Sequence, residues 1–216
     1  MTRAGSARAQ QTKKRTRIQE ENEERILDAA LELFSTYGFR GATIDQIAER
    51  AGMTKPNLLY YFHRKHDIYL AVLRRTLEAW LQPLEALGRT DEPKAEIRAY
   101  LDRKLEMSRD NPKASRLYAM EIMQGAPVIV EVLSTRLKQL VDEKAAVMRR
   151  WIAEGRMADV DPYHLIFMIW ATTQHYADFD VQVRAMLGPA VEDNGHFRTA
   201  ARTLEDVILN GLFAPR

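Results

Sequence analysis

Hydrophobic residues recur every three or four positions over most of the chain, a spacing that predicts α-helices rather than strands. In the first such segment Ile26, Ala30 and Phe34 share one face, and Gly38 ends the pattern. Later segments are separated by breakers such as Pro112 and Gly155. We therefore predict an all-α fold of about nine helices, at residues 20–37, 44–51, 54–62, 68–84, 94–109, 114–124, 128–154, 162–179 and 197–212.

Residues 43–62 (TIDQIAERAGMTKPNLLYYF) predict two short helices joined by a tight turn. Gly52 follows the first helix, where a left-handed backbone closes the last turn. Thr54 is the expected N-cap of the second helix, and Pro56 falls in its first turn, where a missing N–H costs nothing. The outer face of that helix has basic, amide and phenolic side chains, at Lys55, Asn57, Tyr60 and Tyr61. This pattern is typical of a DNA-binding helix-turn-helix, although similar helix pairs occur in proteins that bind no nucleic acid.

Charge is distributed unevenly along the chain. The whole chain has a net charge of +2, but residues 1–75 hold fourteen Lys and Arg against nine Asp and Glu, which leaves the remainder at −3. Residues 1–17 form a basic arm that we expect to be disordered in isolation; its cations are Arg3, Arg8, Lys13, Lys14, Arg15 and Arg17. Beside a helix-turn-helix the arm favours contact with phosphates or a minor groove, and the alternative is a solubilising tail.

Composition excludes several classes of protein. Cysteine is absent, so there is no disulfide framework, thiolate metal site or cysteine nucleophile. No apolar run approaches the roughly 18 residues of a membrane span, and the basic N-terminus lacks the apolar core of a secretory signal. The five histidines include no pair at metalloprotease spacing, and the sequence has no phosphate-binding glycine loop or nucleophile elbow. We expect a soluble cytoplasmic protein that is not an enzyme and needs no cofactor, metal or membrane.

The segment around the turn also carries a more specific motif. It consists of Thr43, Ile47-Ala48, Ala51-Gly52, Thr54, Leu58, Tyr61-Phe62 and Lys65, between two longer helices. In these residues the chain resembles the TetR family of transcriptional repressors, which implies a three-helix DNA-binding head followed by a helical regulatory bundle. One departure is that the family usually has Tyr directly after the leucine at position 58, whereas here Leu59 precedes Tyr60. Which tyrosine contacts which phosphate therefore stays open.

The resemblance and the exposed face together predict how operator DNA is contacted. Lys55 and Asn57, at the exposed start of the second helix, are expected to read base edges. Pro56 lies between them on the same surface. The residues expected to position phosphates are Thr43, Thr54, Tyr60, Tyr61 and Lys65.

Four segments resemble one kind of family member more closely. Residues 57–62, 79–84, 107–127 and 161–179 are similar to a regulator of pyrimidine utilisation. In that protein uracil or thymine is the effector, and its binding releases DNA. The resemblance implies a repressor of pyrimidine catabolism genes with the same effector. A TetR-like regulator with a different small aromatic or heterocyclic effector is the alternative.

The helix expected at 162–179 has suitable chemistry for such a ring. Trp170, Thr173 and Gln174 lie on one face with Ala177, and the carboxamide can present C=O and NH₂ together to a lactam edge. If that helix packs against the helix at 68–84, two indoles and one amide can converge. The predicted ligand-binding residues are Leu77, Trp80, Tyr118, Trp170, Thr173 and Gln174. Weaker candidates are Glu121, His175, Tyr176 and Asp178. From spacing alone, the alternative is two core tryptophans and a Gln174 that caps a buried carbonyl.

We divide the chain into a basic arm at 1–17, a helix-turn-helix DNA-binding domain at 18–66 and an effector-binding and dimerisation domain at 67–216. The helices around 165–179 and 204–212 have apolar residues on more than one face, which predicts a homodimer joined by a four-helix bundle. A thicker single-chain core is the alternative. The rival functions from other classes are an enzyme and a helical protein-interaction module without DNA binding. A DNA affinity that falls steeply with salt distinguishes a DNA-binding regulator from that module.

Overall fold

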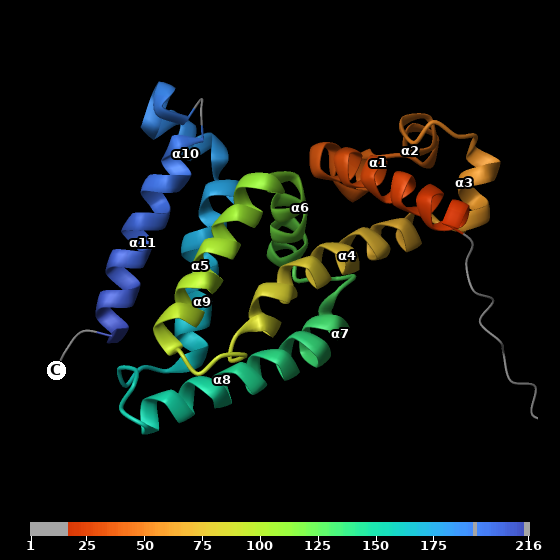
Figure 1. Cartoon of the computed structure of the whole chain (residues 1–216). Helices are drawn as coiled ribbons and strands as arrows, with labels where there is room; N and C mark the ends of the chain where they lie inside the picture. The colour runs from red at the N-terminus through yellow and green to blue at the C-terminus, as the bar shows by residue number, and fades with distance from the viewer. Residues whose placement is uncertain (1–16, 192–193, 214–216) are drawn as a thin grey trace, which may run out of the picture.

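The computed structural model describes residues 17–191 and 194–213, and all secondary structure within these ranges is helical (Figure 1). The elements are α1 (Arg17–Gly41), α2 (Ile44–Arg50), α3 (Lys55–Tyr61), α4 (Lys65–Ala86), α5 (Pro93–Asp110), α6 (Pro112–Met123), α7 (Val130–Val132), η1 (Leu133–Leu137), α8 (Lys138–Ala153), α9 (Pro162–Asp178), α10 (Asp180–Leu187), η2 (Gly188–Val191) and α11 (Gly195–Phe213). With α7, η1 and α8 counted as one continuous helix, the described ranges hold ten α-helices. The predicted all-α class is confirmed.

The head of the molecule consists of α1, α2, α3 and the start of α4, gathered at one end (Figure 1). Its core is built from side chains with no exposed surface, at Ile26, Phe34, Ile47, Leu58 and Ile68. Gly38 has a left-handed φ of 68°, so the regular helix is interrupted where the sequence predicted its end. The helix begins earlier than predicted, because Arg17 is its first residue and pairs with Glu21 at 2.8 Å. Arg17 therefore does not belong to the predicted arm, and the rest of that arm lies outside the described residues.

The bundle is formed by the longer helices that follow. Helix α4 runs from the head into the bundle, where it packs against α5, α6 and α8, while α9 packs against α5 and α6 (Figure 1). Trp151, Leu101 and Leu117 are fully buried among them. Helix α10 was not predicted, because the break at Phe179 is made without glycine or proline. No helix of the described residues is long and apolar enough to span a membrane.

The predicted helix at 128–154 contains an irregularity that periodicity did not reveal. Its first part is a short α-helical turn, α7, followed by the five-residue π-helix η1. The hydroxyls of Ser134 and Thr135 both donate to the carbonyl oxygen of Glu131, at 3.1 and 2.7 Å. Such bonds compete with the regular i to i+4 ladder. Leu133 and Leu137 are the first and last residues of this π-helix, and segments of this type occur often at functional sites.

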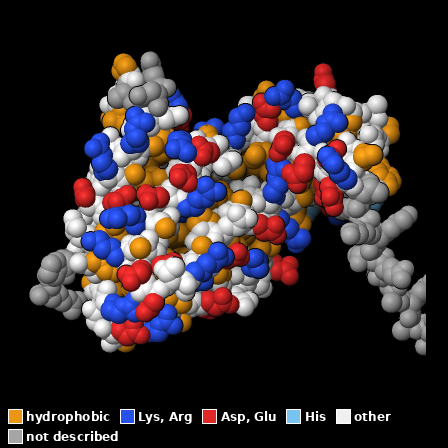
Figure 2. Space-filling view, viewed as in Figure 1, with side chains coloured by type: hydrophobic (Ala, Val, Ile, Leu, Met, Phe, Trp, Pro, Cys, Tyr) orange, Lys and Arg blue, Asp and Glu red, His pale blue; other side chains and the backbone are white. Residues whose placement is uncertain are grey.

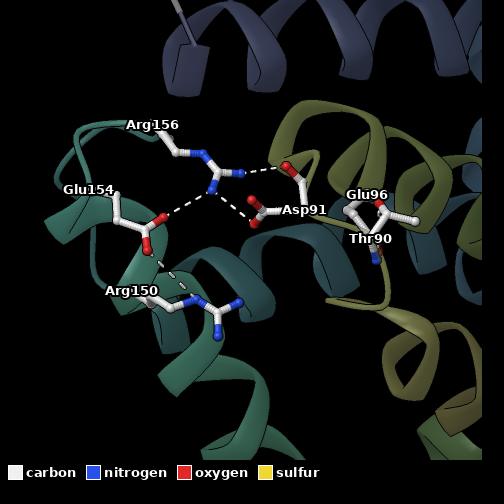
Figure 3. Close-up of polar contacts among 6 residues, drawn as sticks. All are labelled: Thr90, Asp91, Glu96, Arg150, Glu154 and Arg156. Atoms are coloured by element: carbon white, nitrogen blue, oxygen red, sulfur yellow. Dashed lines mark hydrogen bonds and ion pairs between the residues drawn. The ribbon is translucent and has the colours of Figure 1, made fainter.

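At the end of the bundle far from the head, Arg156 joins two loops (Figure 3). Its Nη1 lies 2.9 Å from Oδ1 of Asp91, in the loop before α5, and 3.0 Å from Oε2 of Glu154, at the end of α8. Glu96 accepts hydrogen bonds from the backbone and hydroxyl of Thr90 in the same loop. Because these groups are largely exposed, they add little stability. They do connect the loop after α4 to the end of α8, so the far end of α4 is held in place.

Candidate functional site

The helix-turn-helix is built by two side-chain caps. Thr43 Oγ1 accepts from the backbone N–H of Gln46 at 3.2 Å, and the Gln46 side chain accepts from the backbone N–H of Thr43 at 2.9 Å. This reciprocal capping box fixes the start of α2. Thr54 Oγ1 accepts from the backbone N–H of Asn57 at 3.4 Å and caps α3 by this single bond. Both predicted N-caps are confirmed.

The turn between the two helices is held by α1. Gly52 has a φ of +66°, which a side chain would strain. The guanidinium of Arg25 donates to the carbonyl of Ala51 at 2.6 Å. A Cβ added to Gly52 would lie only 2.8 Å from Nη2 of Arg25. The turn therefore requires glycine both for its backbone and for the close approach of Arg25.

Six of the eight predicted DNA-contacting residues are exposed to solvent. The exposed ones are Thr43, Thr54, Lys55, Pro56, Asn57 and Tyr60. Lys55 Nζ lies 3.0 Å from Oδ2 of Asp45 on α2, and both side chains are largely solvent-exposed. A predicted base reader is thus paired with a carboxylate on the same surface.

Tyr61 and Lys65 are the two predicted contacts that are only partly exposed, and both are hydrogen-bonded within the head. Asn22 Nδ2 donates to the phenol oxygen of Tyr61 at 2.9 Å. Lys65 Nζ donates to the carbonyl of Ala42 at 2.8 Å and lies 4.7 Å from the centroid of Phe39. An ammonium has three donors and a phenol can also donate, so both keep capacity for a phosphate. These side chains are oriented by the head before any DNA is present.

Two adjacent cavities lie beside α4, α6 and α9. The smaller has a volume of about 40 Å³ and is lined by Leu77, Trp80, Leu81, Leu84, Lys104, Tyr118, Leu137, Trp170 and Gln174. The larger has a volume of about 710 Å³ and adds, among others, Ser35, Arg116, Met120, Met123, Leu133, Asp178 and Phe179. Tyr118, Leu137, Trp170 and Gln174 line both. The two cavities therefore adjoin at these four side chains.

Five of the six predicted ligand-binding residues line these cavities. Leu77, Trp80, Tyr118, Trp170 and Gln174 come from three helices that are far apart in the sequence. The carboxamide of Gln174 makes no hydrogen bond with any residue that the structure describes, so it does not cap a buried carbonyl. The indole N–H of Trp170 donates to Tyr100 Oη at 2.6 Å, which fixes the ring. Burial raises the pKa of Tyr118 to about 12, so its phenol stays neutral.

Thr173 is the exception among the predicted residues. It has no exposed surface, and it lines neither cavity. Its hydroxyl donates to the carbonyl of Ile169 at 2.7 Å, one turn back on the same helix. A threonine inside a helix commonly satisfies its hydroxyl in this way. The prediction that Thr173 lines the ligand site is therefore corrected.

Lys104 also lines the smaller cavity, although it is not among the ligand-binding residues predicted from the sequence. Its side chain is only 2% exposed, and Nζ lies 3.5 Å from the ring centroid of Trp80. Burial lowers the pKa of Lys104 well below its ordinary value, and the nearby carboxylate of Asp178 partly opposes that shift. A signal was present, because position 104 follows Tyr100 and Leu101 by four and three residues on the buried face of α5.

Asp178, a weaker candidate, lines the larger cavity. Ser115 on α6 donates a short hydrogen bond from its hydroxyl to this carboxylate. Burial raises the pKa of Asp178, while the Ser115 hydrogen bond and the charge of Lys104 lower it again. The cavities thus hold a buried cation and a half-buried anion on facing helices.

Glu121, another weaker candidate, lies at the junction between α4 and α6 rather than in a cavity wall. Its carboxylate accepts from the Tyr69 hydroxyl at 3.0 Å and from the backbone N–H of Val128 at 2.7 Å. The Tyr69 ring packs against Phe34 and Phe39 of the head, with centroids 5.0 and 4.9 Å away. Tyr69 is thus hydrogen-bonded to α6, which lines the larger cavity, while its ring is packed into the head.

The remaining weak candidates, His175 and Tyr176, do not line the cavities. His175 stacks on Phe179 with ring centroids 5.0 Å apart, and Tyr176 packs against Phe197 of α11. Large apolar side chains are exposed on these elements, at Phe167 and Met168 of α9, at Phe179 directly after it and at Val207 of α11. Figure 2 shows hydrophobic side chains at the surface of the bundle, between charged ones.

Comparisons with known proteins cover almost the whole chain. Residues 26–72 match the model of bacterial regulatory proteins of the tetR family, and residues 73–215 match the C-terminal region of YcdC-like protein. The HTH-type transcriptional regulator RutR of Escherichia coli K12 is 47% identical over 201 residues, which are 93% of this chain and 95% of that protein.

Solved structures with low sequence identity share the fold. The ketosteroid regulator KstR2 of Mycobacterium tuberculosis is 18% identical with a TM-score of 0.70, over 89% of this chain and 95% of that one. AibR, solved in complex with isovaleryl coenzyme A and operator DNA, is 17% identical with a TM-score of 0.65, over 90% and 100% of the two chains.

Proposed function

The chain belongs to the TetR family of bacterial transcriptional regulators, and from that premise we propose that it represses pyrimidine catabolism genes and is released from its operator by uracil or thymine. Family membership makes it a DNA-binding regulator and not an enzyme. The choice of effector rests on the resemblance of residues 57–62, 79–84, 107–127 and 161–179 to a regulator of pyrimidine utilisation. A repressor of bacterial genes acts beside the chromosome, so we place it in the cytoplasm.

The observation that supports this effector best is the wall of the smaller cavity. It brings together the indoles of Trp80 and Trp170 and the carboxamide of Gln174. Indoles offer flat apolar faces for stacking, and a carboxamide without a protein partner can pair with an N–H and a C=O on one ring edge. The 40 Å³ chamber is too small for a pyrimidine ring by itself, so the ring must extend past Gln174 into the larger cavity.

We propose that release from DNA works through α4. This helix leaves the head and supplies Leu77 and Trp80 to the cavity wall. A ring between α4 and α9 favours one tilt of α4, and the contact of Tyr69 with Phe34 and Glu121 makes head and bundle respond together. In a dimer the two recognition helices must lie about 34 Å apart to enter successive major grooves. The ligand can shift this spacing only as far as it binds one arrangement better than the other.

The homodimer is part of the same proposal. Phe167 and Met168 on α9, Phe179 directly after it and Val207 on α11 are each at least 45% exposed, and grouped apolar side chains of this kind mark interaction sites. A two-fold pairing of α9 and α11 with a second copy covers them. Light scattering at micromolar concentration is expected to give the mass of two chains, and a monomer that still binds palindromic DNA tightly contradicts the pairing.

A binding experiment tests the whole proposal. Selection from random-sequence duplexes yields an operator probe, and fluorescence anisotropy then measures its affinity with and without uracil, thymine, cytosine, adenine and guanine. We expect uracil or thymine at millimolar concentration to weaken operator binding at least about tenfold. Unchanged binding with all five bases rejects a nucleobase effector, whereas failure to select any sequence rejects the DNA-binding function.

A second effector class is favoured by one observation, the size of the larger cavity. A volume of about 710 Å³ is within the range of sites for drug-sized ligands and exceeds what one pyrimidine ring fills. A larger aromatic or heterocyclic effector is therefore the alternative. In the same assay, release by a larger ring and not by uracil or thymine selects this alternative.

A further inference from the structure

Lys104 is an unusual residue in the wall of the smaller cavity. It is 2% exposed, yet its ammonium makes no hydrogen bond and no ion pair with any residue that the structure describes. Its one close contact is with the face of Trp80, at 3.5 Å from the ring centroid. The other groups around it are apolar or neutral, apart from the Asp178 carboxylate, which acts on it without a direct contact.

Such a residue is costly to the ligand-free protein. A buried lysine without a hydrogen-bonding partner loses its hydration, and a cation–π contact recovers only part of that loss. A methionine of similar length would fill the same volume without the cost. A buried group that the fold does not need for its own stability is therefore a good candidate for a group that a ligand uses.

We propose that Lys104 identifies the effector by donating a hydrogen bond to an exocyclic carbonyl oxygen, the one that uracil and thymine have where cytosine has an amino group, so that the regulator responds to the former and excludes the latter. This inference rests on the proposed function, since it concerns the same cavity. It adds the residue that selects among pyrimidines and the chemical feature that it selects.

The chemistry of the two ring types differs at one edge. Uracil and thymine present a carbonyl oxygen beside a ring N–H, whereas cytosine presents an amino group beside an unprotonated ring nitrogen. A lysine ammonium has three donors and no acceptor. Facing an amino group, it leaves two donors opposed in a desolvated site. Burial favours the neutral form of the Lys104 amine, while the carboxylate of Asp178 and a carbonyl acceptor on a bound ring favour the protonated form.

Gln174 and Lys104 have complementary roles in this arrangement. Both line the smaller cavity, from α9 and α5 respectively. A carboxamide can rotate by half a turn and exchange its donor and acceptor, so Gln174 alone cannot tell a lactam edge from its reverse. Lysine offers only a donor when it is charged. The cavity therefore needs Lys104 to fix which edge is accepted.

The test compares Lys104→Met with the unaltered full-length chain. Isothermal titration is expected to show uracil binding weakened about 10- to 100-fold, the range for the loss of a hydrogen bond from a charged donor. Operator affinity without effector is expected to stay within about twofold, because the head is untouched. The ligand-free variant is expected to melt about 2–4 °C higher, because an unpaired buried cation is removed. A lysine that only supports the fold would give a lower melting temperature instead.

Selectivity gives the sharpest readout. The unaltered chain is expected to bind uracil at least about tenfold more tightly than cytosine, and Lys104→Met is expected to bring the two affinities within about threefold of each other. Lys104→Gln keeps an N–H donor but also offers an acceptor, so it should retain uracil binding better than methionine does and still lose the preference over cytosine. Lys94→Met, at an exposed position of α5, is the matched control and should change neither affinity.

Each outcome decides a different question. Equal uracil binding by the unaltered chain and Lys104→Met overturns this inference and leaves the proposed function intact. A preference for uracil over cytosine that survives in Lys104→Met also overturns it. If the unaltered chain binds operator DNA but neither uracil nor thymine, the proposed effector falls and this inference falls with it. If Lys104→Met does not fold, the selectivity of Lys104→Gln decides instead.

Discussion

The recognition helix α3 and the cavity beside α4 are opposite kinds of binding site. The side chains of α3 expected to read bases are exposed, charged or polar, and held by caps within three residues of them in the sequence. The cavity is built from five elements, and its polar groups are buried in an apolar wall. The recognition helix is suited to a highly charged polymer that carries condensed counterions. The cavity is suited to a small neutral ring that must be recognised by a few hydrogen bonds.

The difference teaches where each affinity comes from. Binding to DNA gains from the release of counterions, so it depends on ionic strength and tolerates loosely held side chains. Binding in an apolar cavity gains from shape and from unsatisfied polar groups, so it depends on single atoms. One chain combines both because α4 belongs to both regions.

The largest expected effect is a difference in how strongly operator affinity and uracil affinity depend on salt concentration. Raising the salt concentration from 50 to 200 mM is expected to weaken operator binding by about 1,000-fold or more, as for a protein that makes about six phosphate contacts. Uracil is neutral, so its affinity for the DNA-free protein should change less than about twofold. Anisotropy and calorimetry at matched salt concentrations measure the two responses. Parallel salt slopes for DNA and uracil would contradict the comparison.

The next prediction concerns a substitution in the cavity that lowers uracil affinity and leaves the DNA-binding head unchanged. Gln174→Leu replaces the unpaired carboxamide with an apolar side chain of similar size, and uracil affinity is expected to fall about 10- to 100-fold. Operator affinity should stay within about twofold. Gln139→Leu is the control, because Gln139 is an exposed amide on α8 that lines neither of the two cavities. Unchanged uracil affinity in Gln174→Leu would show that the carboxamide does not contact the effector.

A smaller effect concerns the junction that joins the two regions. Tyr69→Phe keeps the ring against Phe34 and removes only the hydroxyl that donates to Glu121. We expect DNA and uracil affinities close to those of the unaltered chain, but a loss of about three- to tenfold in the factor by which uracil weakens DNA binding.

The matched control for the junction is Tyr163→Phe. It removes a comparable hydrogen bond, from Tyr163 to Asp142 at 2.8 Å, at the end of the bundle far from the head. Equal losses of coupling in the two variants would show that the Tyr69 hydroxyl acts through general stability.

The smallest effect changes the DNA-reading surface. Asp45→Asn removes the carboxylate paired with Lys55 and a negative charge from the surface that we expect to meet DNA. Operator affinity is expected to rise about two- to fivefold at low salt, with a smaller gain at high salt. Glu49→Gln is the control, because Glu49 is an exposed acid on the same helix that forms no ion pair or hydrogen bond with α3. A fall in affinity for Asp45→Asn would mean that the carboxylate positions Lys55 for DNA and is not merely an opposing charge.

The sequence predicted the head well because its structure is set by neighbouring residues. Thr43, Gly52 and Thr54 act through bonds and backbone angles within three positions of themselves. Residue types with known backbone preferences at such short spacing leave few alternatives. The DNA-contacting roles of the exposed side chains stay a prediction.

The cavity was predicted only in part because distant segments decide it. The face shared by Trp170 and Gln174 followed from helical spacing, and both line the cavity. Thr173 lies close to the same face, but its hydroxyl found a carbonyl on its own helix. The burial of Lys104 depends on α4 and α9 covering α5, which no local pattern contains.

The position of the tryptophans gives the molecule a built-in optical reporter. Two of the three tryptophans, Trp80 and Trp170, line the cavity, whereas Trp151 is fully buried near the end of α8 and residues 1–79 contain none. An effector in the proposed site lies beside both indoles and is expected to alter their fluorescence emission, while a DNA duplex on the head has no indole beside it. Occupation of the cavity can therefore be followed by intrinsic fluorescence in a single cuvette, with labelled DNA reporting its own release at a different wavelength.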